Sequence, residues 1–184
     1  MTNTSLEQLR DFLERVKPVL KPTMRIADYG GTKKIGSNVV KKMLKGGGLK
    51  DYHMLDFDNG FDLRKSIKGK KFDLGICMDL LEHTTNPFLV AKNIIDSLNP
   101  NALLFVTVPF SWPLHGYPDD LWRFAPSGLF ELFKDKTLRA ATIYMLQDSA
   151  DPSKNENIMP KMVAPFFRVV GIFQKNGKGK NMKV

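Results

Sequence analysis

The sequence Met24-Arg-Ile-Ala-Asp28, followed by Tyr29-Gly30-Gly31-Thr32-Lys-Lys-Ile35-Gly36, decides the fold. The first part predicts a buried strand, and the second predicts a glycine turn that leads into a helix. A second apolar segment, Tyr52-His-Met-Leu55, then ends at Asp56. This order of elements is how α/β proteins bind an adenosine-containing cofactor, because glycines let the backbone approach the ligand and the acid accepts hydrogen bonds from ribose hydroxyls.

The rest of the chain continues this pattern. Apolar runs at 72–79 and 102–108 alternate with helical segments, which predicts a parallel sheet covered on both faces. The last two strand candidates, 138–146 and 165–174, form a hairpin-like pair. We therefore expect a Rossmann-like doubly wound α/β sheet, mostly parallel with an antiparallel last strand. Ser5 is a plausible N-cap of an amphipathic helix that precedes the first strand.

Length and composition favour a single domain. The chain has 184 residues, 42% of them hydrophobic, which is enough for one sizeable core. We expect this domain to span residues 1–174 and the lysine-rich residues 175–184 to form a disordered tail. The N-terminus lacks the pattern of a secretory signal and no apolar run approaches membrane-spanning length, so the sequence predicts a cytoplasmic protein. The lone Cys77 lies in an apolar run and indicates a core residue.

The formal net charge of +9 favours an anionic partner. The lysines and arginines at 64–71 have no aromatic residues between them for base stacking, so solvated surface charge is favoured over a nucleic-acid interface. The nucleic-acid alternative stays open at this point.

The segment Asp79-Leu-Leu-Glu82-His83-Thr-Thr-Asn86-Pro87 resembles the signature of class I S-adenosylmethionine-dependent methyltransferases of the methyltransferase type 11 group. The resemblance extends from Ile26 to about Phe133. It implies a methyltransferase with S-adenosylmethionine as its cofactor.

The resemblance also assigns cofactor-binding residues. It places Asp28, Gly30 and Gly31 around the methionine part of the cofactor, and Asp56 on the ribose. The remaining positions are the adenine contacts Asp62 and Leu63, and the residues Asp79 and Leu80 that line the donor-methyl pocket.

The glycine turn departs from the family pattern at Thr32, which replaces the second glycine of Gly-x-Gly. Threonine does not adopt a positive φ freely, so either Gly31 makes the tight turn or cofactor binding is altered. A dinucleotide fingerprint fits less well, because Thr32 and Ile35 stand where it needs glycines.

The loop at 109–124 is the candidate acceptor site. It also resembles a segment found in methyltransferases of bacterial surface-glycan and secondary-metabolite pathways. It supplies Trp112, Tyr117 and Trp122 as a pocket wall, and His115 as the candidate general base.

Two acids of this loop have two open interpretations. Asp119 or Asp120 could orient His115 or the acceptor, and we count both as candidate catalytic residues. Arg123 could instead pair with one of them and only hold the loop together.

The sequence therefore predicts a methyltransferase that acts on a small-molecule or glycan-type acceptor, most simply at oxygen. A nucleic-acid-binding protein or nucleic-acid methyltransferase is the first alternative, although the Asp/Asn-Pro-Pro-Tyr segment of base-amino methyltransferases is replaced by Asp79-Leu-Leu-Glu82. A methyltransferase-like protein without turnover is the second alternative. We name no metal ligands, because Glu82 and His83 are adjacent in sequence rather than on one helix face, and the sequence leaves a metal requirement open. The sequence leaves the oligomeric state open.

Overall fold

A computed structural model gives the structure of the protein, and it describes residues 3–31, 37–46, 48–67, 69–115, 119–147 and 167–177. Six strands form one sheet in the order β2-β1-β3-β4-β6-β5. β2, β1, β3 and β4 are parallel, and β6 runs antiparallel to both of its neighbours, β4 and β5. The predicted Rossmann-like sheet with an antiparallel last strand is confirmed.

The elements alternate along the chain as the apolar pattern predicts. The strands are β1 (Arg25–Tyr29), β2 (Asp51–Leu55), β3 (Phe72–Met78), β4 (Leu98–Ser111), β5 (Leu138–Gln147) and β6 (Phe167–Lys175). The helices are α1 (Asn3–Val16), α2 (Ser37–Gly46), α3 (Pro87–Asp96) and α4 (Pro126–Leu132), with short 3-10 helices η1 (Lys17–Val19), η2 (Phe57–Asn59) and η3 (Leu81–His83).

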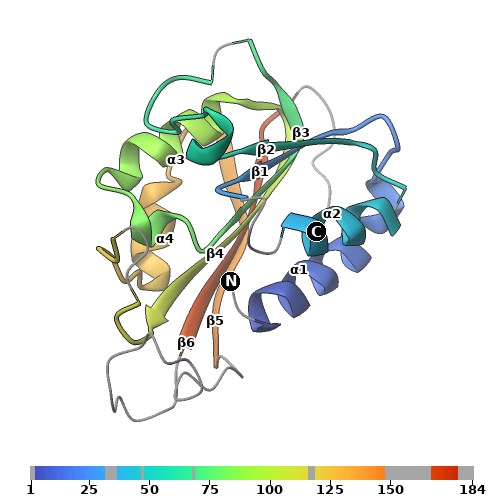
Figure 1. The fold of residues 1–184 in the computed structure, drawn as a ribbon. Helices are drawn as coiled ribbons and strands as arrows, with labels where there is room; N and C mark the ends of the chain where they lie inside the picture. Colours follow the sequence, from blue (N-terminus) through green and yellow to red (C-terminus); the bar gives the residue numbers. More distant parts are fainter. Residues whose placement is uncertain are drawn as a thin grey trace.

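The sheet separates two apolar cores, because successive side chains of a strand point to opposite faces. Ile26 of β1 packs with Phe12 of α1 and Leu44 of α2, whereas Tyr29 packs on the other side with Ile94 of α3 and Leu129 of α4. Figure 1 shows the same arrangement, with α1 and α2 on one face of the sheet and α3 and α4 on the other. Burial on both faces explains the nearly continuous apolar runs of β3 and β4.

Several predicted boundaries differ in the structure, and β4 in particular runs from Leu98 to Ser111 beyond the predicted run at 102–108. α1 begins at Asn3, so Ser5 lies inside its first turn, and its hydroxyl donates to Asp79 rather than capping the helix. Lys175 is the last residue of β6, and the next residue, Asn176, donates its backbone N–H to Thr137 at 2.7 Å. β6 therefore extends one residue past the expected end of the domain, and residues 178–184 of the expected tail lie outside the described part.

The connection from β2 to β3 contains η2 and turns but no strand at Phe61-Asp62-Leu63. The sheet therefore has six strands, and β1 lies directly between β2 and β3. None of the helices described in this structure is both long and apolar enough to cross a membrane.

Candidate functional site

The predicted site residues follow the carboxyl ends of the four parallel strands. Asp28 lies in β1, Asp56 follows β2, Asp79 follows β3, and the loop with His115 follows β4. Carboxyl ends of neighbouring parallel strands meet at one edge of a sheet, which is where open α/β sheets bind ligands.

The glycine turn after β1 is closely packed. Gly30 has a φ of 80°, and its N–H donates to the carbonyl of Leu55 at 2.9 Å. A Cβ at Gly30 would lie 2.8 Å from Leu80 Cδ1, and a Cβ at Gly31 would lie 2.4 Å from a carboxylate oxygen of Asp28. Both positions therefore exclude a side chain. Thr32, the predicted departure from the family pattern, lies outside the described residues with the rest of 32–36.

Asp28 is a buried acid, 4% exposed, and the hydroxyl of Tyr52 donates to its carboxylate. Burial raises the pKa of Asp28 to about 7, against the hydrogen bond from Tyr52, and the nearby Asp56 raises it further. Asp56 is more accessible, and its Oδ1 accepts the backbone N–H of Asp58 at 2.9 Å, which begins η2. The two acids therefore lie together at the tips of β1 and β2, as the sequence predicts.

Asp62 and Leu63 have separate environments. The guanidinium of Arg64 donates to Asp62 at 2.9 and 3.1 Å, and this hydrogen bonding lowers the pKa of the carboxyl. Leu63 is 8% exposed and belongs to the core on the α3 side, and its carbonyl accepts the amide of Asn93 at 2.9 Å. The described residues show no contact between this pair and the glycine turn.

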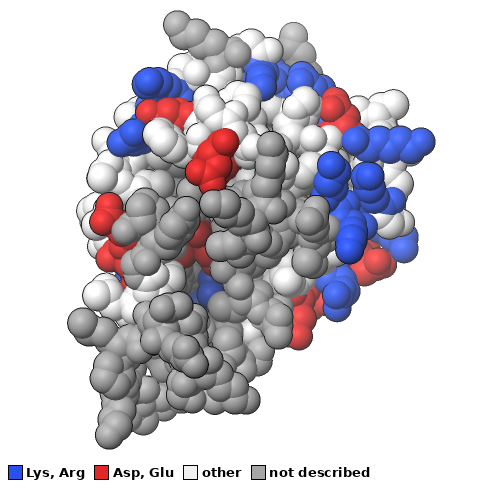
Figure 2. All heavy atoms as spheres, in the orientation of Figure 1, with Lys and Arg blue, Asp and Glu red and all other residues white. Residues whose placement is uncertain are grey.

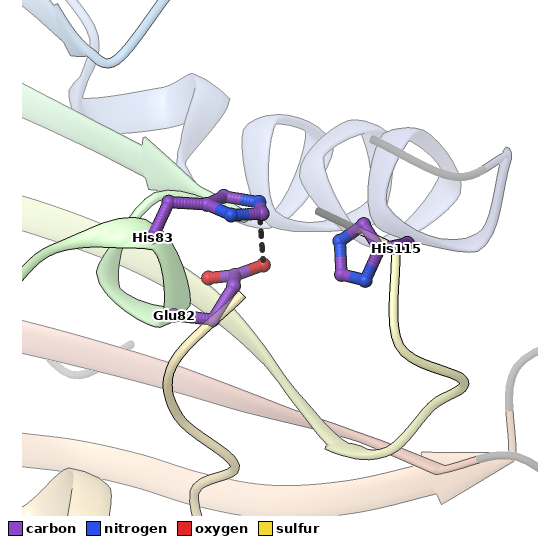
Figure 3. A group of neighbouring side chains, drawn as sticks. All are labelled: Glu82, His83 and His115. Atoms are coloured by element: carbon purple, nitrogen blue, oxygen red, sulfur yellow. Dashed lines mark ion pairs between the residues drawn. The ribbon is translucent and has the colours of Figure 1, made fainter. Parts of the chain in front are cut away.

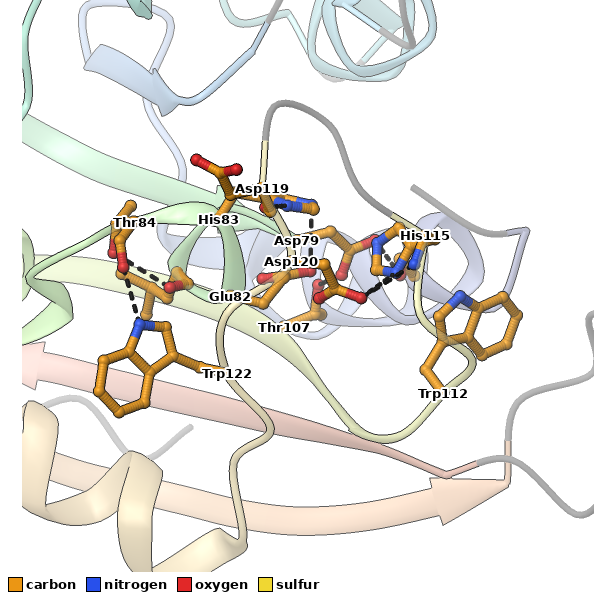
Figure 4. A network of polar contacts seen from close by, with 12 residues as sticks. Asp79, Glu82, His83, Thr84, Thr107, Trp112, His115, Asp119, Asp120 and Trp122 are labelled. Carbon is orange, nitrogen blue, oxygen red and sulfur yellow. Dashed lines mark hydrogen bonds and ion pairs between the residues drawn. The ribbon is translucent and has the colours of Figure 1, made fainter. Parts of the chain in front are cut away.

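Asp79 is held from three sides, as Figure 4 shows in part. Thr107 of β4 donates to its carboxylate at 3.0 Å, Ser5 of α1 donates at 3.2 Å, and Arg168 of β6 forms an ion pair with it. Burial opposes ionisation, but the charge of Arg168 and the hydroxyl donors hold the pKa of Asp79 below its usual value. These contacts support a left-handed backbone at Asp79, with a φ of 51°.

Glu82 is the second acid that follows β3 in the sequence, and its side chain is 1% exposed. Burial and the charge of Asp79 raise its pKa to about 8, with Arg168 acting in the opposite direction. Among the residues that the structure describes, none donates a hydrogen bond to its buried Oε2. The single guanidinium of Arg168 thus lies near two buried acids and pairs directly with Asp79.

The structure brings His83 and His115 to Glu82. One candidate ligand atom from each of these three residues lies within 4.8 Å of the other two (Figure 3). The two imidazole rings are 5.1 Å apart between centroids, and His83 Nε2 is 3.9 Å from Glu82 Oε1. Adjacency in sequence therefore does not keep Glu82 and His83 from a common site.

Both interpretations of the acceptor loop apply to Asp120, which pairs with Arg123 and also lies close to His115. Its carboxylate accepts two hydrogen bonds from Arg123, at 2.5 and 2.6 Å, and lies 3.0 Å from His115 Nδ1. Arg123 also donates to the carbonyl oxygens of Trp112 and Pro113, so it does hold the loop together. Burial opposes ionisation of Asp120, but the hydrogen bonds from Arg123 and from the backbone N–H of His115 lower its pKa.

His115 itself is kept neutral. Burial lowers its pKa, although the carboxylate of Asp120 acts in the opposite direction. Asp119, the other candidate, uses its backbone carbonyl, which lies 2.5 Å from His83 Nδ1, while its side chain is exposed and points away from the histidines (Figure 4).

The predicted pocket wall is only partly formed by the described residues. Trp112 and Trp122 lie at opposite ends of the polar network in Figure 4, and the indole N–H of Trp122 donates to the carbonyl of Thr84 at 2.8 Å. Tyr117 lies outside the described residues. The two tryptophans therefore flank the site rather than share one wall.

Two other regions of the molecule have fewer groups that could take part in catalysis or ligand binding. A pocket of about 420 Å³ lies at the opposite edge of the sheet, near the start of β1, and Asp73 and Lys21 are its only charged residues. Basic side chains crowd the right-hand side of Figure 2, where Figure 1 places α1 and α2, and Lys41, Lys42 and Lys45 of α2 are exposed. The positive charge is thus on the surface, whereas the acids of the site are mostly buried.

Protein-family models and the sequences of curated proteins give no match to this chain. Solved structures do share its fold. Coclaurine N-methyltransferase bound to N-methylheliamine and SAH is 12% identical with a TM-score of 0.58, and the match covers 95% of this chain and 74% of that one. A SAM-dependent methyltransferase from Methanosarcina mazei is 13% identical with a TM-score of 0.59, covering 89% and 98%.

The cyclase SpnF is 14% identical with a TM-score of 0.61, and the match covers 92% of this chain and 80% of that one. These similarities show that the chain has the Rossmann-like fold of class I methyltransferases. Because one of these structures is a cyclase, the fold by itself does not define the reaction.

Proposed function

We propose that this protein transfers a methyl group from S-adenosylmethionine to a small-molecule or glycan-type acceptor, at an oxygen atom. The fold and the cofactor product bound in the coclaurine N-methyltransferase structure support this cofactor. The glycine turn supports it independently, since Gly31 lies against Asp28 and Gly30 against Leu80 with no room for a Cβ.

The cofactor would lie across the tips of β1, β2 and β3. Asp28, Gly30 and Gly31 would hold its methionine part, and Asp56 would accept hydrogen bonds from the ribose hydroxyls. The remaining predicted contacts are Asp62 and Leu63 for adenine, and Asp79 and Leu80 beside the donor methyl group. Because Arg64 donates to both carboxylate oxygens of Asp62 and Lys65 lies 4.0 Å from one of them, the ligand can bind Asp62 only at an oxygen that these side chains leave accessible.

The observation that carries the proposal is the position of His115, whose ring is held by the acceptor loop at the same edge of the sheet as the glycine turn. Its Nδ1 lies 3.0 Å from Asp120 and 3.2 Å from the carbonyl of Pro113, which leaves Nε2 as the ring nitrogen that can accept a proton. Methyl transfer to a hydroxyl is a displacement at the sulfonium methyl group and requires the hydroxyl proton to leave. We assign the removal of this proton to His115.

Cofactor binding can be tested by thermal shift with S-adenosylmethionine and S-adenosylhomocysteine. Both ligands should raise the melting temperature of the wild type, and Asp56→Ala should abolish the shift because the ribose loses its acceptor. Asp58→Ala is the matched control, since the Asp58 side chain is exposed two residues away and should leave the shift unchanged. A wild type that responds to neither ligand would contradict the proposal and favour the non-catalytic alternative.

The role of His115 can be separated from cofactor binding. His115→Ala should keep the thermal shift but lower methyl transfer by about 10²–10⁴-fold, the usual effect of losing a proton-transfer group. The assay follows labelled methyl groups from S-adenosylmethionine into a panel of phenols and monosaccharides. His53→Ala, which removes the histidine of β2, should transfer methyl groups at the wild-type rate.

A further inference from the structure

The segments that follow two neighbouring strands supply Glu82, His83 and His115. Glu82 and His83 lie in η3, directly behind β3, and His115 lies in the loop behind β4. Their candidate ligand atoms lie within 4.8 Å of one another, and Figure 3 shows the three side chains directed toward a common point. The set of one carboxylate and two imidazoles is a donor set that binds Zn²⁺ in proteins.

Both imidazoles are oriented by contacts behind them. His83 Nδ1 is hydrogen-bonded to the carbonyl oxygen of Asp119 at 2.5 Å, and His115 Nδ1 to the carbonyl oxygen of Pro113 at 3.2 Å, with a carboxylate oxygen of Asp120 3.0 Å away. These oxygens only accept hydrogen bonds, so each Nδ1 carries the proton and each Nε2 keeps its lone pair. Metal-binding histidines characteristically donate their other N–H to a carbonyl or carboxylate in this way.

Glu82 supplies an independent observation. The side chain is 1% exposed, and none of the described residues donates to its Oε2. A buried oxygen without a partner destabilises the fold unless an ion, a water molecule or a ligand occupies its side. Arg168, whose charge also acts on Glu82, is paired with Asp79.

We propose that Glu82, His83 and His115 bind a divalent metal ion of the Zn²⁺ type. Ligand atoms bound to Zn²⁺ at about 2.0–2.1 Å lie roughly 3.3 Å apart in a tetrahedral site, so separations of up to 4.8 Å need to shorten by up to roughly 1.5 Å. His115 lies on a loop, and a shift of its side chain can supply this closure. Three protein ligands leave a position open for an oxygen of the acceptor.

The role of this ion rests on the proposed function, whereas its binding does not. A hydroxyl bound to the ion would lose its proton to solvent, because a divalent metal lowers the pKa of a bound oxygen. The oxygen would then form a bond to the methyl carbon while the carbon–sulfur bond breaks, and the electron pair of that bond would stay on sulfur. With the ion bound, this loss of the proton to solvent would replace the direct transfer to His115 that the proposed function assigns to the protein without the ion.

The test measures Zn²⁺ binding by calorimetry, with untagged protein that has been treated with EDTA and dialysed. The wild type should bind one equivalent. Glu82→Gln, His83→Ala and His115→Ala should each weaken binding by more than about 100-fold, since removal of contacts behind the ligands alone costs about 10–100-fold. His53→Ala is the matched control, because the chain has three histidines and His53 lies in β2, away from the cluster.

Circular dichroism of each variant controls for folding, and His115→Ala is the decisive variant because its side chain lies on a loop. No Zn²⁺ binding by the wild type, or equal binding by His53→Ala and His115→Ala, would overturn the metal site. The thermal shift with S-adenosylhomocysteine separates the two proposals. Zn²⁺ binding without a cofactor shift contradicts only the proposed function, and a cofactor shift without Zn²⁺ binding contradicts only the metal site.

Discussion

The two groups of acids at the carboxyl edge of the sheet are stabilised in different ways. At the tips of β1 and β2, the carboxylates accept hydrogen bonds from neutral donors. Asp28 accepts from the hydroxyl of Tyr52, and Asp56 accepts from a backbone N–H. Behind β3, an ion pair with Arg168 serves Asp79, and Glu82 has no donor to its Oε2 among the described residues.

The two groups of acids therefore differ in their ionisation near neutral pH. Burial raises the pKa of Asp28 to about 7, so its negative charge varies near neutral pH. Asp79 stays ionised because Arg168 lowers its pKa against the effect of burial. Asp28 should therefore make the free energy of unfolding depend on pH. Asp79 and Glu82 should make it depend on the loss or gain of a nearby cation.

The largest expected effect comes from breaking the ion pair behind β3. Arg168→Met leaves the buried Asp79 without its cation and should lower the free energy of unfolding by about 3–5 kcal/mol, as for other buried pairs that lose one partner. Urea denaturation measures the change. Arg25→Met is the matched control, because the pair of Arg25 with Asp51 at 3.3 Å is partly exposed, with side chains 38% and 47% accessible, and should contribute at most about 1 kcal/mol.

A double substitution tests the cause of this effect. Asp79→Asn combined with Arg168→Met removes both charges and should recover much of the lost stability, since no unpaired charge remains at that position. Equal destabilisation by Arg168→Met and Arg25→Met would show that the two acid groups do not differ as described.

A smaller effect is expected on the β1 side, and it depends on pH. The pKa of Asp28 is raised from 3.8 to about 7 in the folded state, so the folded protein binds one more proton than the unfolded chain between these values. Stability from this group is therefore lost as pH rises toward 7. From pH 5 to pH 8, Asp28→Asn should gain about 2–3 kcal/mol relative to the wild type.

Urea denaturation at a series of pH values measures this gain. Parallel stability curves for Asp28→Asn and the wild type would contradict the assignment. The variant should also bind S-adenosylhomocysteine more weakly, because the methionine part of the cofactor carries an ammonium group that a carboxylate attracts.

The smallest expected effect concerns Asp119. Only its backbone carbonyl contacts His83, so Asp119→Asn should change Zn²⁺ affinity by less than about twofold. Asp120→Asn, which weakens the carboxylate behind His115, should reduce this affinity by about 10–100-fold. Calorimetry compares the two variants directly. A larger loss for Asp119→Asn than for Asp120→Asn would contradict the arrangement of the acceptor loop.

The fold could be predicted because its signals are local. The apolar runs at 72–79 and 102–108 become β3 and β4, and Asn86 caps α3 where Asn86-Pro87 indicates a helix start. The boundary at Ser5 was wrong because its hydroxyl has a tertiary partner, Asp79, which a local capping rule does not consider. β6 ends one residue later than the predicted strand, at Lys175, whose side chain donates to the carbonyl of Ile95, a partner 80 positions away.

The site could be predicted only in part, for the same reason. The position of the acids at strand tips follows from the order of strands, and Arg123 does pair with Asp120, its neighbour at three residues. Arg168 could not be assigned, because it reaches Asp79 from a strand 89 residues later. The cluster of Glu82, His83 and His115 depends on the 3-10 turn of η3 and on the path of the acceptor loop. Histidines behind two neighbouring parallel strands were the available signal.

The hydrogen bond from Ser5 to Asp79 brings α1 into contact with the buried acids, although the two residues are 74 positions apart. Crosslinking, labelling or rigid fusion at this first helix should therefore alter the environment of Asp79. A fluorine label on α1 could serve as a spectroscopic probe of whether the sheet edge is empty or occupied, without any change to the residues proposed to bind ligands.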